Sequence, residues 1–137
     1  TLVAGRAPVA PLRTLGGEPA SLSAALSGRD RTIVFWNPDC GFCARMLDDL
    51  RALDRADRDA GRQLLVISTG DAEANRAMGL SAPVLLDDAF AAGEQLGVTG
   101  TPSAVRVDAH GRVASPVAVG TEAVLALAAG ARSPVNA

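Results

Sequence analysis

Two cysteines, Cys40 and Cys43, are the residues of this sequence whose type and spacing best suit covalent chemistry. In a helix that begins at Cys40, residues three apart share a face, so the two sulfurs can reach bonding distance. The free N–H groups and the positive end of the helix dipole would favour a thiolate at Cys40. A thiolate is the nucleophile in disulfide exchange, which would leave Cys43 as the resolving thiol.

A structural disulfide, or two inert reduced thiols, is the alternative interpretation of this pair. A disulfide between Cys40 and Cys43 closes a very short loop and removes little chain entropy, so it would stabilise the fold only weakly. The pair also stands where a predicted strand meets a predicted helix. Both observations favour a redox-active pair over a static one.

The sequence pattern predicts alternating strands and helices around the cysteines. Residues 32–36 are β-branched and aromatic, which suits a buried strand, and residues 41–60 have the apolar spacing of an amphipathic helix. The other predicted strands are residues 63–68, 83–86, 103–107 and 112–119, and the other predicted helices are residues 21–26, 71–78, 87–96 and 121–129. We expect a mostly parallel sheet with helices on both faces and a final hairpin that adds an antiparallel edge.

The composition of the chain limits the classes of function. Its 137 residues suit one domain, 1–137, and residues 1–19 predict an irregular arm with one short strand. A net charge of −2 without a run of basic residues gives no case for nucleic acid. Two cysteines and one histidine do not make a four-ligand zinc site, so we expect no metal, and no cofactor besides the Cys40–Cys43 disulfide. No signal peptide or membrane-spanning run is visible in the numbered chain.

A second motif, Gly100-Thr101-Pro102, precedes the predicted strand at residues 103–107. An ordinary loop proline is the simpler interpretation of Pro102. Beside a redox pair, however, a cis Thr101–Pro102 bond would turn the Thr101 backbone toward the sulfurs, and cis X–Pro bonds are rare in folded proteins. We therefore predict a cis bond that faces the cysteines.

Together the two motifs resemble a known family. FWNPDCGFC at residues 35–43 and GVTGTPSAVRVDAHGR at residues 97–112 are similar to the thioredoxin superfamily, and within it to the TlpA-like, redoxin-type branch. The resemblance covers about residues 9–128. It implies an α/β thioredoxin fold in which helices flank a central mixed β-sheet. It also implies an N-terminal extension and a helix–strand insertion at about residues 71–86.

The resemblance also implies an activity, thiol–disulfide oxidoreduction with protein partners. Cys40 matches the attacking cysteine of the family, Cys43 the resolving cysteine and Pro102 the cis-proline. The Gly-Phe dipeptide between the cysteines lacks the histidine that oxidising relatives often place before the second one, which favours a reductant. We expect protein disulfide or dithiol substrates, an upstream membrane or soluble thiol reductant, a monomer and an extracytoplasmic (periplasmic or cell-envelope) location.

The sequence further predicts an apolar surface on which a protein substrate docks beside Cys40. Its predicted members are Trp36, Pro38, Phe42, Thr101 and Pro102.

Three positions depart from the family pattern, namely Val34, Asp39 and Asp48. Val34 stands where thioredoxins carry a buried carboxylate that can take the proton of the second cysteine. We therefore predict that Cys43 is poorly acidic.

Two other functions compete with disulfide exchange. A peroxiredoxin-like peroxidase commonly needs a threonine in a Pro-x-x-x-Thr-x-x-Cys setting, and Asn37 and Pro38 do not supply it. A non-catalytic thioredoxin-fold binding module with a static disulfide would have an unreactive or inaccessible Cys40. Assays of disulfide reduction and of peroxide consumption distinguish the three.

Overall fold

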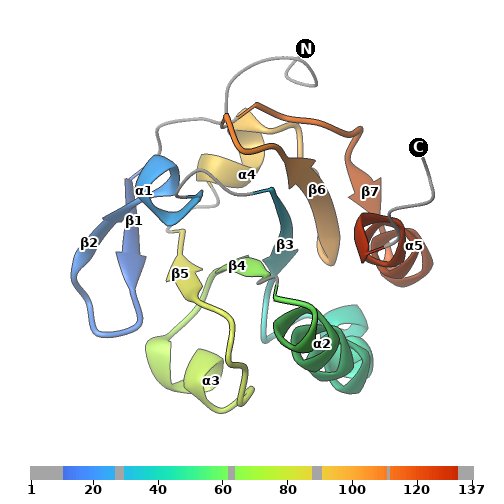
Figure 1. Cartoon of the computed structure of the whole chain (residues 1–137). Coiled ribbons are helices and arrows are strands. Elements are labelled where there is room, and N and C mark those ends of the chain that lie inside the picture. Colours follow the sequence, from blue (N-terminus) through green and yellow to red (C-terminus); the bar gives the residue numbers. More distant parts are fainter. Residues whose placement is uncertain (1–10, 27–29, 62–63, 88–90, 111, 133–137) are drawn as a thin grey trace.

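The computed structural model describes residues 11–26, 30–61, 64–87, 91–110 and 112–132 (Figure 1). The first ten residues of the predicted N-terminal arm lie outside these ranges. The elements follow the chain in the order β1 (Pro11–Thr14), β2 (Pro19–Ser21), α1 (Leu22–Leu26), β3 (Arg31–Trp36), α2 (Gly41–Asp59), β4 (Leu65–Ser68), α3 (Ala72–Arg76), β5 (Val84–Leu86), α4 (Ala91–Gln95), β6 (Ser103–Val107), β7 (Ala118–Val119) and α5 (Thr121–Arg132).

The strands form one mixed sheet in the order β2-β1-β5-β4-β3-β6-β7. β3, β4 and β5 run parallel to one another, whereas β6 is antiparallel to β3 and β7 to β6. β1 is antiparallel to both of its neighbours, β2 and β5. The mixed sheet confirms the predicted fold class, but the expectation that the sheet is mostly parallel is wrong. The N-terminal extension adds antiparallel pairs on one side, as the final hairpin does on the other.

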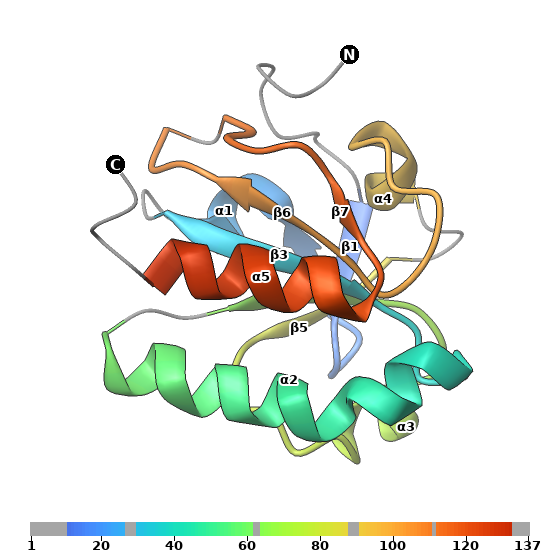
Figure 2. The same cartoon turned by 90° about the vertical axis from the view of Figure 1, so that its right-hand side faces the viewer.

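Alternating side chains of β3 enter two apolar cores on opposite faces of the sheet. Ile33 and Phe35 pack with residues of α1 and α4, and Val34 and Trp36 pack with residues of α2 and α5. Figures 1 and 2 show the same division, with α2 and α5 together on one side of the sheet. Because both faces of β3 are covered, every residue from 32 to 36 is buried, as its unbroken apolar run predicts.

The N-terminal extension is more regular than the sequence predicts. Instead of one short strand it forms a hairpin of β1 and β2, closed by hydrogen bonds from Gly17 N–H to the Thr14 carbonyl oxygen and from Thr14 N–H to the Glu18 carbonyl oxygen. Gly17 has a positive φ of 90°, which glycine adopts without strain. Local glycine and proline content predicts the turn, but it does not reveal that β5 offers an edge for β1.

The predicted strand at residues 112–119 is wrong over most of its length. Only β7 is a strand there, and Val113 makes a single bridge to Val107. Between them the Ser115 hydroxyl accepts the N–H of Arg106 at 3.0 Å, and Pro116 has no N–H to donate. A side chain thus replaces a backbone partner in the ladder, and the pairing is interrupted.

The helix–strand insertion, α3 and β5, is present where the sequence predicts it. The Asp71 carboxylate caps α3 by accepting the N–H of Ala74 at 2.7 Å. The loop between α3 and β5 is held by the buried carboxylate of Asp54 on α2, which accepts the N–H groups of Ser81 at 2.6 Å and Ala82 at 3.1 Å.

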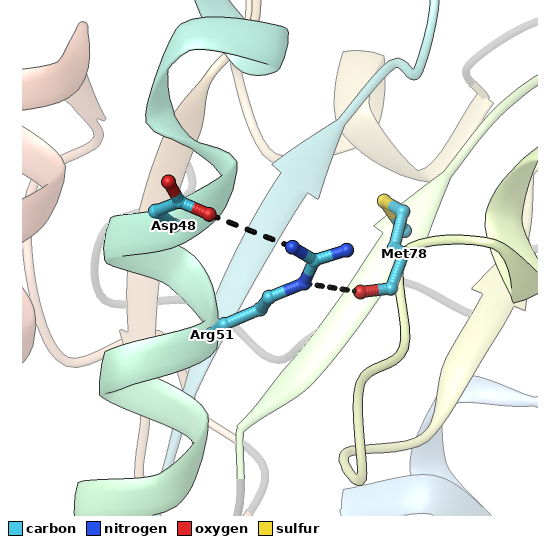
Figure 3. A network of polar contacts seen from close by, with 3 residues as sticks. All are labelled: Asp48, Arg51 and Met78. Carbon is cyan, nitrogen blue, oxygen red and sulfur yellow. Dashed lines mark hydrogen bonds and ion pairs between the residues drawn. The ribbon is translucent and has the colours of Figure 1, made fainter.

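A second contact joins α2 to the end of α3 (Figure 3). Arg51 on α2 donates from Nε to the Met78 carbonyl oxygen at 2.7 Å, and its Nη1 lies 3.5 Å from the Asp48 carboxylate. Arg58 also donates a hydrogen bond to the Ser81 hydroxyl. The insertion is therefore attached to the helix that follows the two cysteines.

The register brings several strand ends to one edge of the sheet. Trp36 at the end of β3 lies opposite Ser68 at the end of β4, and Ser68 lies opposite Leu86 at the end of β5. On the other side of β3, the first residue of β6, Ser103, lies opposite Val119 at the end of β7. The segments that follow β3 and precede β6 therefore meet, and these segments contain Cys40 and Thr101.

Candidate active site

Cys40 is the residue at which α2 begins. Its backbone is extended, with φ −81° and ψ 126°, and its carbonyl oxygen accepts the N–H of Ala44 at 2.9 Å. The turn before it is closed by hydrogen bonds from Cys40 N–H to the Asn37 carbonyl oxygen at 3.0 Å and from Asp39 N–H to the Asn37 side chain at 2.9 Å. This local geometry agrees with the position predicted for Cys40 at the helix N-terminus.

The second motif lies against the first. The peptide bond between Thr101 and Pro102 is cis, and the Cys40 Sγ donates a hydrogen bond to the Thr101 carbonyl oxygen at 3.5 Å. Thr101 is 61 residues from Cys40 in the sequence. The sheet therefore assembles the site from two segments, as the order of the two motifs predicts.

The environment of the Cys40 sulfur favours its thiolate. Burial, the largest single influence, raises its pKa, but hydrogen bonds from the N–H of Cys43, from the Thr101 side chain, from the N–H of Phe42 and from the Cys43 thiol oppose it. Their sum places the pKa of Cys40 below the ordinary thiol value. Because Cys40 is only partly buried, this thiolate can meet a partner.

Cys43 has the opposite properties. It is completely buried, and burial raises its pKa to about 11, with further increases from the charge of Cys40 and from the hydrogen bond that its thiol gives to Cys40. The N–H of Asn37 and the Thr101 side chain lower the pKa of Cys43, but by less than burial raises it. The sulfur shares its apolar core with Val34, so the side chain at that strand position offers no base.

The predicted docking surface is wrong at two of its five members. Trp36 is 1% exposed and Pro102 is buried, because β3 and β6 are central strands whose ends are covered by neighbouring segments. Pro38 and Thr101 are half-buried, and Phe42 is 62% exposed with the Arg45 guanidinium 5.0 Å from its ring centroid. Periodicity alone does not show which aromatic residue beside a motif reaches the surface.

The sequence did not predict that an exposed apolar side chain, Val119, lies near this site; it is 56% exposed. It is connected to the site through Gly120, whose N–H donates to the Pro102 carbonyl oxygen at 2.9 Å. A correct prediction of the pairing between β6 and β7 would have placed Val119 beside the Pro102 segment.

An open groove of about 680 Å³ also begins at the site and was not predicted. It is lined by Asn37, Thr69, Glu94 and residues 98–101. Thr101 is shared between the groove and the hydrogen bond to Cys40. Three loops at one edge of the sheet and helix α4 build this groove, which no single motif reveals.

Among the described residues, no group of three or more histidine, cysteine, aspartate or glutamate side chains is placed to hold a metal ion. Within the same ranges, no helix is long and apolar enough to cross a membrane.

The sheet, its helices and the cysteine pair at the start of α2 define a thioredoxin-fold protein of the thiol–disulfide oxidoreductase class. The Redoxin family model matches residues 3–124, and the chain belongs to this family. A search of curated proteins finds no match.

Solved structures share the fold at low sequence identity. The thioredoxin domain of a thiol-disulfide oxidoreductase from Bacteroides vulgatus is 20% identical with a TM-score of 0.75, over 97% of this chain and 100% of that chain. A putative thiol:disulfide interchange protein DsbE from Chlorobium tepidum is 20% identical with a TM-score of 0.72, over 94% and 96%. A secreted Mycobacterium tuberculosis disulfide oxidoreductase homologous to E. coli DsbE is 24% identical with a TM-score of 0.63, over 85% and 94%.

Proposed function

We propose that this protein reduces disulfides in protein partners through Cys40 and Cys43. The observation that carries the proposal is the contrast between the two thiols, since the accessible Cys40 has a lowered pKa and the buried Cys43 a raised one. Such a pair divides the reaction into an attack by one sulfur and a release by the other.

The proposed reaction balances within the two cysteines and the substrate disulfide. The Cys40 thiolate attacks one substrate sulfur, breaks the substrate S–S bond and releases the other sulfur as a thiolate. Cys43 then loses its proton and attacks Cys40, which breaks the mixed disulfide and releases the second substrate thiolate. The substrate gains two electrons, and the protein is left with a Cys40–Cys43 disulfide. An upstream thiol reductant must return those electrons.

We further propose an extracytoplasmic location and a reducing direction. The location is supported by the resemblance to the TlpA-like branch, and the similar M. tuberculosis protein is described as secreted. The reducing direction is supported by the Gly-Phe dipeptide between the cysteines, which lacks the histidine often found in oxidising relatives.

A paired assay tests the proposed activity. Reduced protein is expected to reduce the disulfides of insulin with dithiothreitol as electron donor, and to consume hydrogen peroxide no faster than free thiol does. Peroxide consumption without insulin reduction would favour the peroxidase alternative. Inactivity toward both substrates would favour a binding module with a static disulfide.

Phe42→Ala is expected to slow exchange with insulin about fivefold to tenfold and to slow exchange with a small neutral disulfide much less. The reason is that the exposed ring beside Cys40 can bury apolar area only against a large partner, and truncation of an interface aromatic often costs more than 1 kcal/mol. The measurement is kcat/KM for both substrates. Arg45→Gln removes the guanidinium over the ring and keeps the phenyl group, so it is the control. Equal slowing of both substrates by Phe42→Ala would exclude a docking role.

A further inference from the structure

Charged side chains on both faces of the sheet lie near Cys40, in addition to the exposed Asp39 directly before it in the chain. Phe42 and Arg45 belong to α2, which packs on one face, whereas α4 packs on the other and carries Glu94 (Figures 1 and 2). The Arg45 guanidinium lies over the Phe42 ring, so positive charge stands beside the apolar side chain. Negative charge stands on the α4 side, in the groove.

The groove lies beside the segments that contact Cys40. Its lining includes Thr101, whose carbonyl oxygen accepts the Cys40 Sγ hydrogen bond at 3.5 Å, and Asn37, whose carbonyl oxygen accepts the Cys40 N–H. A polypeptide joined to Cys40 in a mixed disulfide can therefore leave the sulfur over these residues. An extended chain advances about 3.3 Å per residue, so positions close to the substrate cysteine would enter the groove.

Glu94 is the one residue with a charged side chain among the described residues that line the groove. Its helix is held in place at its start, because the buried Asp87 carboxylate accepts the N–H groups of Ala92 at 2.9 Å and Gly93 at 3.3 Å. The other described residues of the lining carry no charge. A substrate segment in the groove therefore meets the Glu94 carboxylate on a fixed support.

We propose that Glu94 makes this groove selective for protein substrates that carry a lysine or arginine close in sequence to the cysteine that Cys40 attacks. The proposal rests on the proposed function and names the chemistry of its substrate. A basic side chain would form an ion pair with Glu94, and an acidic side chain would be repelled. Glu94 is exposed, so the pair is expected to change kcat/KM by about twofold to fivefold, and less at high salt.

Peptide disulfides that differ in one residue test this selectivity. Lysine, glutamine or glutamate is placed in turn at the two positions before and the two positions after the reacting cysteine, and kcat/KM is measured for each peptide. At one or more positions the wild type is expected to prefer lysine over glutamate. Glu94→Gln should remove this preference, and Glu94→Lys should reverse it.

Glu73→Gln is the matched control, because Glu73 is an exposed glutamate on α3 that does not line the groove. It should keep the preference of the wild type. Equal reduction of all peptides by the wild type, or loss of the preference in Glu73→Gln as well, would overturn the proposal.

A binding measurement separates this proposal from the proposed function. Reduced wild-type protein is titrated with the same peptides in which serine replaces cysteine, and the amide signals of Thr99 and Gly100 are followed by NMR. The lysine peptide is expected to shift these signals more than the glutamate peptide, and Glu94→Gln should abolish the difference. If no peptide disulfide is reduced but this difference is present, the proposed activity fails and the charge selectivity stands. If peptides are reduced without charge preference and the shifts are equal, the selectivity fails and the activity stands.

Discussion

Cys43→Ser is expected to stop the reaction at a stable mixed disulfide between Cys40 and the substrate. The accessible Cys40 thiolate can still attack the substrate. Without the buried thiol of Cys43, however, no group is left to displace the substrate from Cys40. Turnover with insulin should fall to the rate of the uncatalysed exchange. Non-reducing electrophoresis and mass spectrometry of the trapped complex provide the measurement.

Cys40→Ser is the control for this experiment. It should also abolish turnover, but without accumulation of a mixed disulfide, because Cys43 is completely buried and its pKa is raised to about 11. Trapping by Cys40→Ser and not by Cys43→Ser would reverse the roles assigned to the two cysteines. Equal trapping by both variants would contradict a division of labour between an accessible and a buried thiol.

The second expected result is a resolution step whose rate rises about tenfold per pH unit from pH 6 to 9. The attack of Cys43 on the mixed disulfide requires its thiolate. In that state the Cys40 sulfur carries no charge, but burial, the largest cause of the raised pKa of Cys43, remains, so only a small fraction of Cys43 is ionised at pH 7. Raising the pH toward 11 increases that fraction in proportion, so the rate should show no plateau in the neutral range. Rapid-quench measurement of substrate release from a preformed mixed disulfide provides the rate.

Alkylation of Cys40 in the Cys43→Ser variant is the internal control for this pH profile. Because the pKa of Cys40 is lowered, its alkylation rate should reach half of its plateau at a lower pH than that of a free thiol measured alongside. A plateau of the resolution rate below about pH 7 would contradict the prediction and would show that a base serves Cys43. Glu94→Gln would then be the first variant to measure.

Much of the core fold was predictable because its determinants are local. The apolar run of β3, the helical spacing of α2 and the cysteine at their junction lie within one continuous segment. The positive φ of Gly61, just after α2, likewise follows from the preference of glycine for helix ends. The same is true of the insertion, where turn residues mark the limits of α3 and β5 within one to three residues.

The sequence by itself therefore determined the strand–turn–helix unit, the positions of the two cysteines within it and the absence of a carboxylate at Val34. Only the tertiary structure decided that Pro102 is buried and that Glu94 lines a groove beside the Cys40 site. These properties depend on the pairing of β6 with β3 and on the helices that cover each face of the sheet. Periodicity specifies which residues share a face of one element, but contacts between segments 61 residues apart arise only when the strands pair and the faces pack.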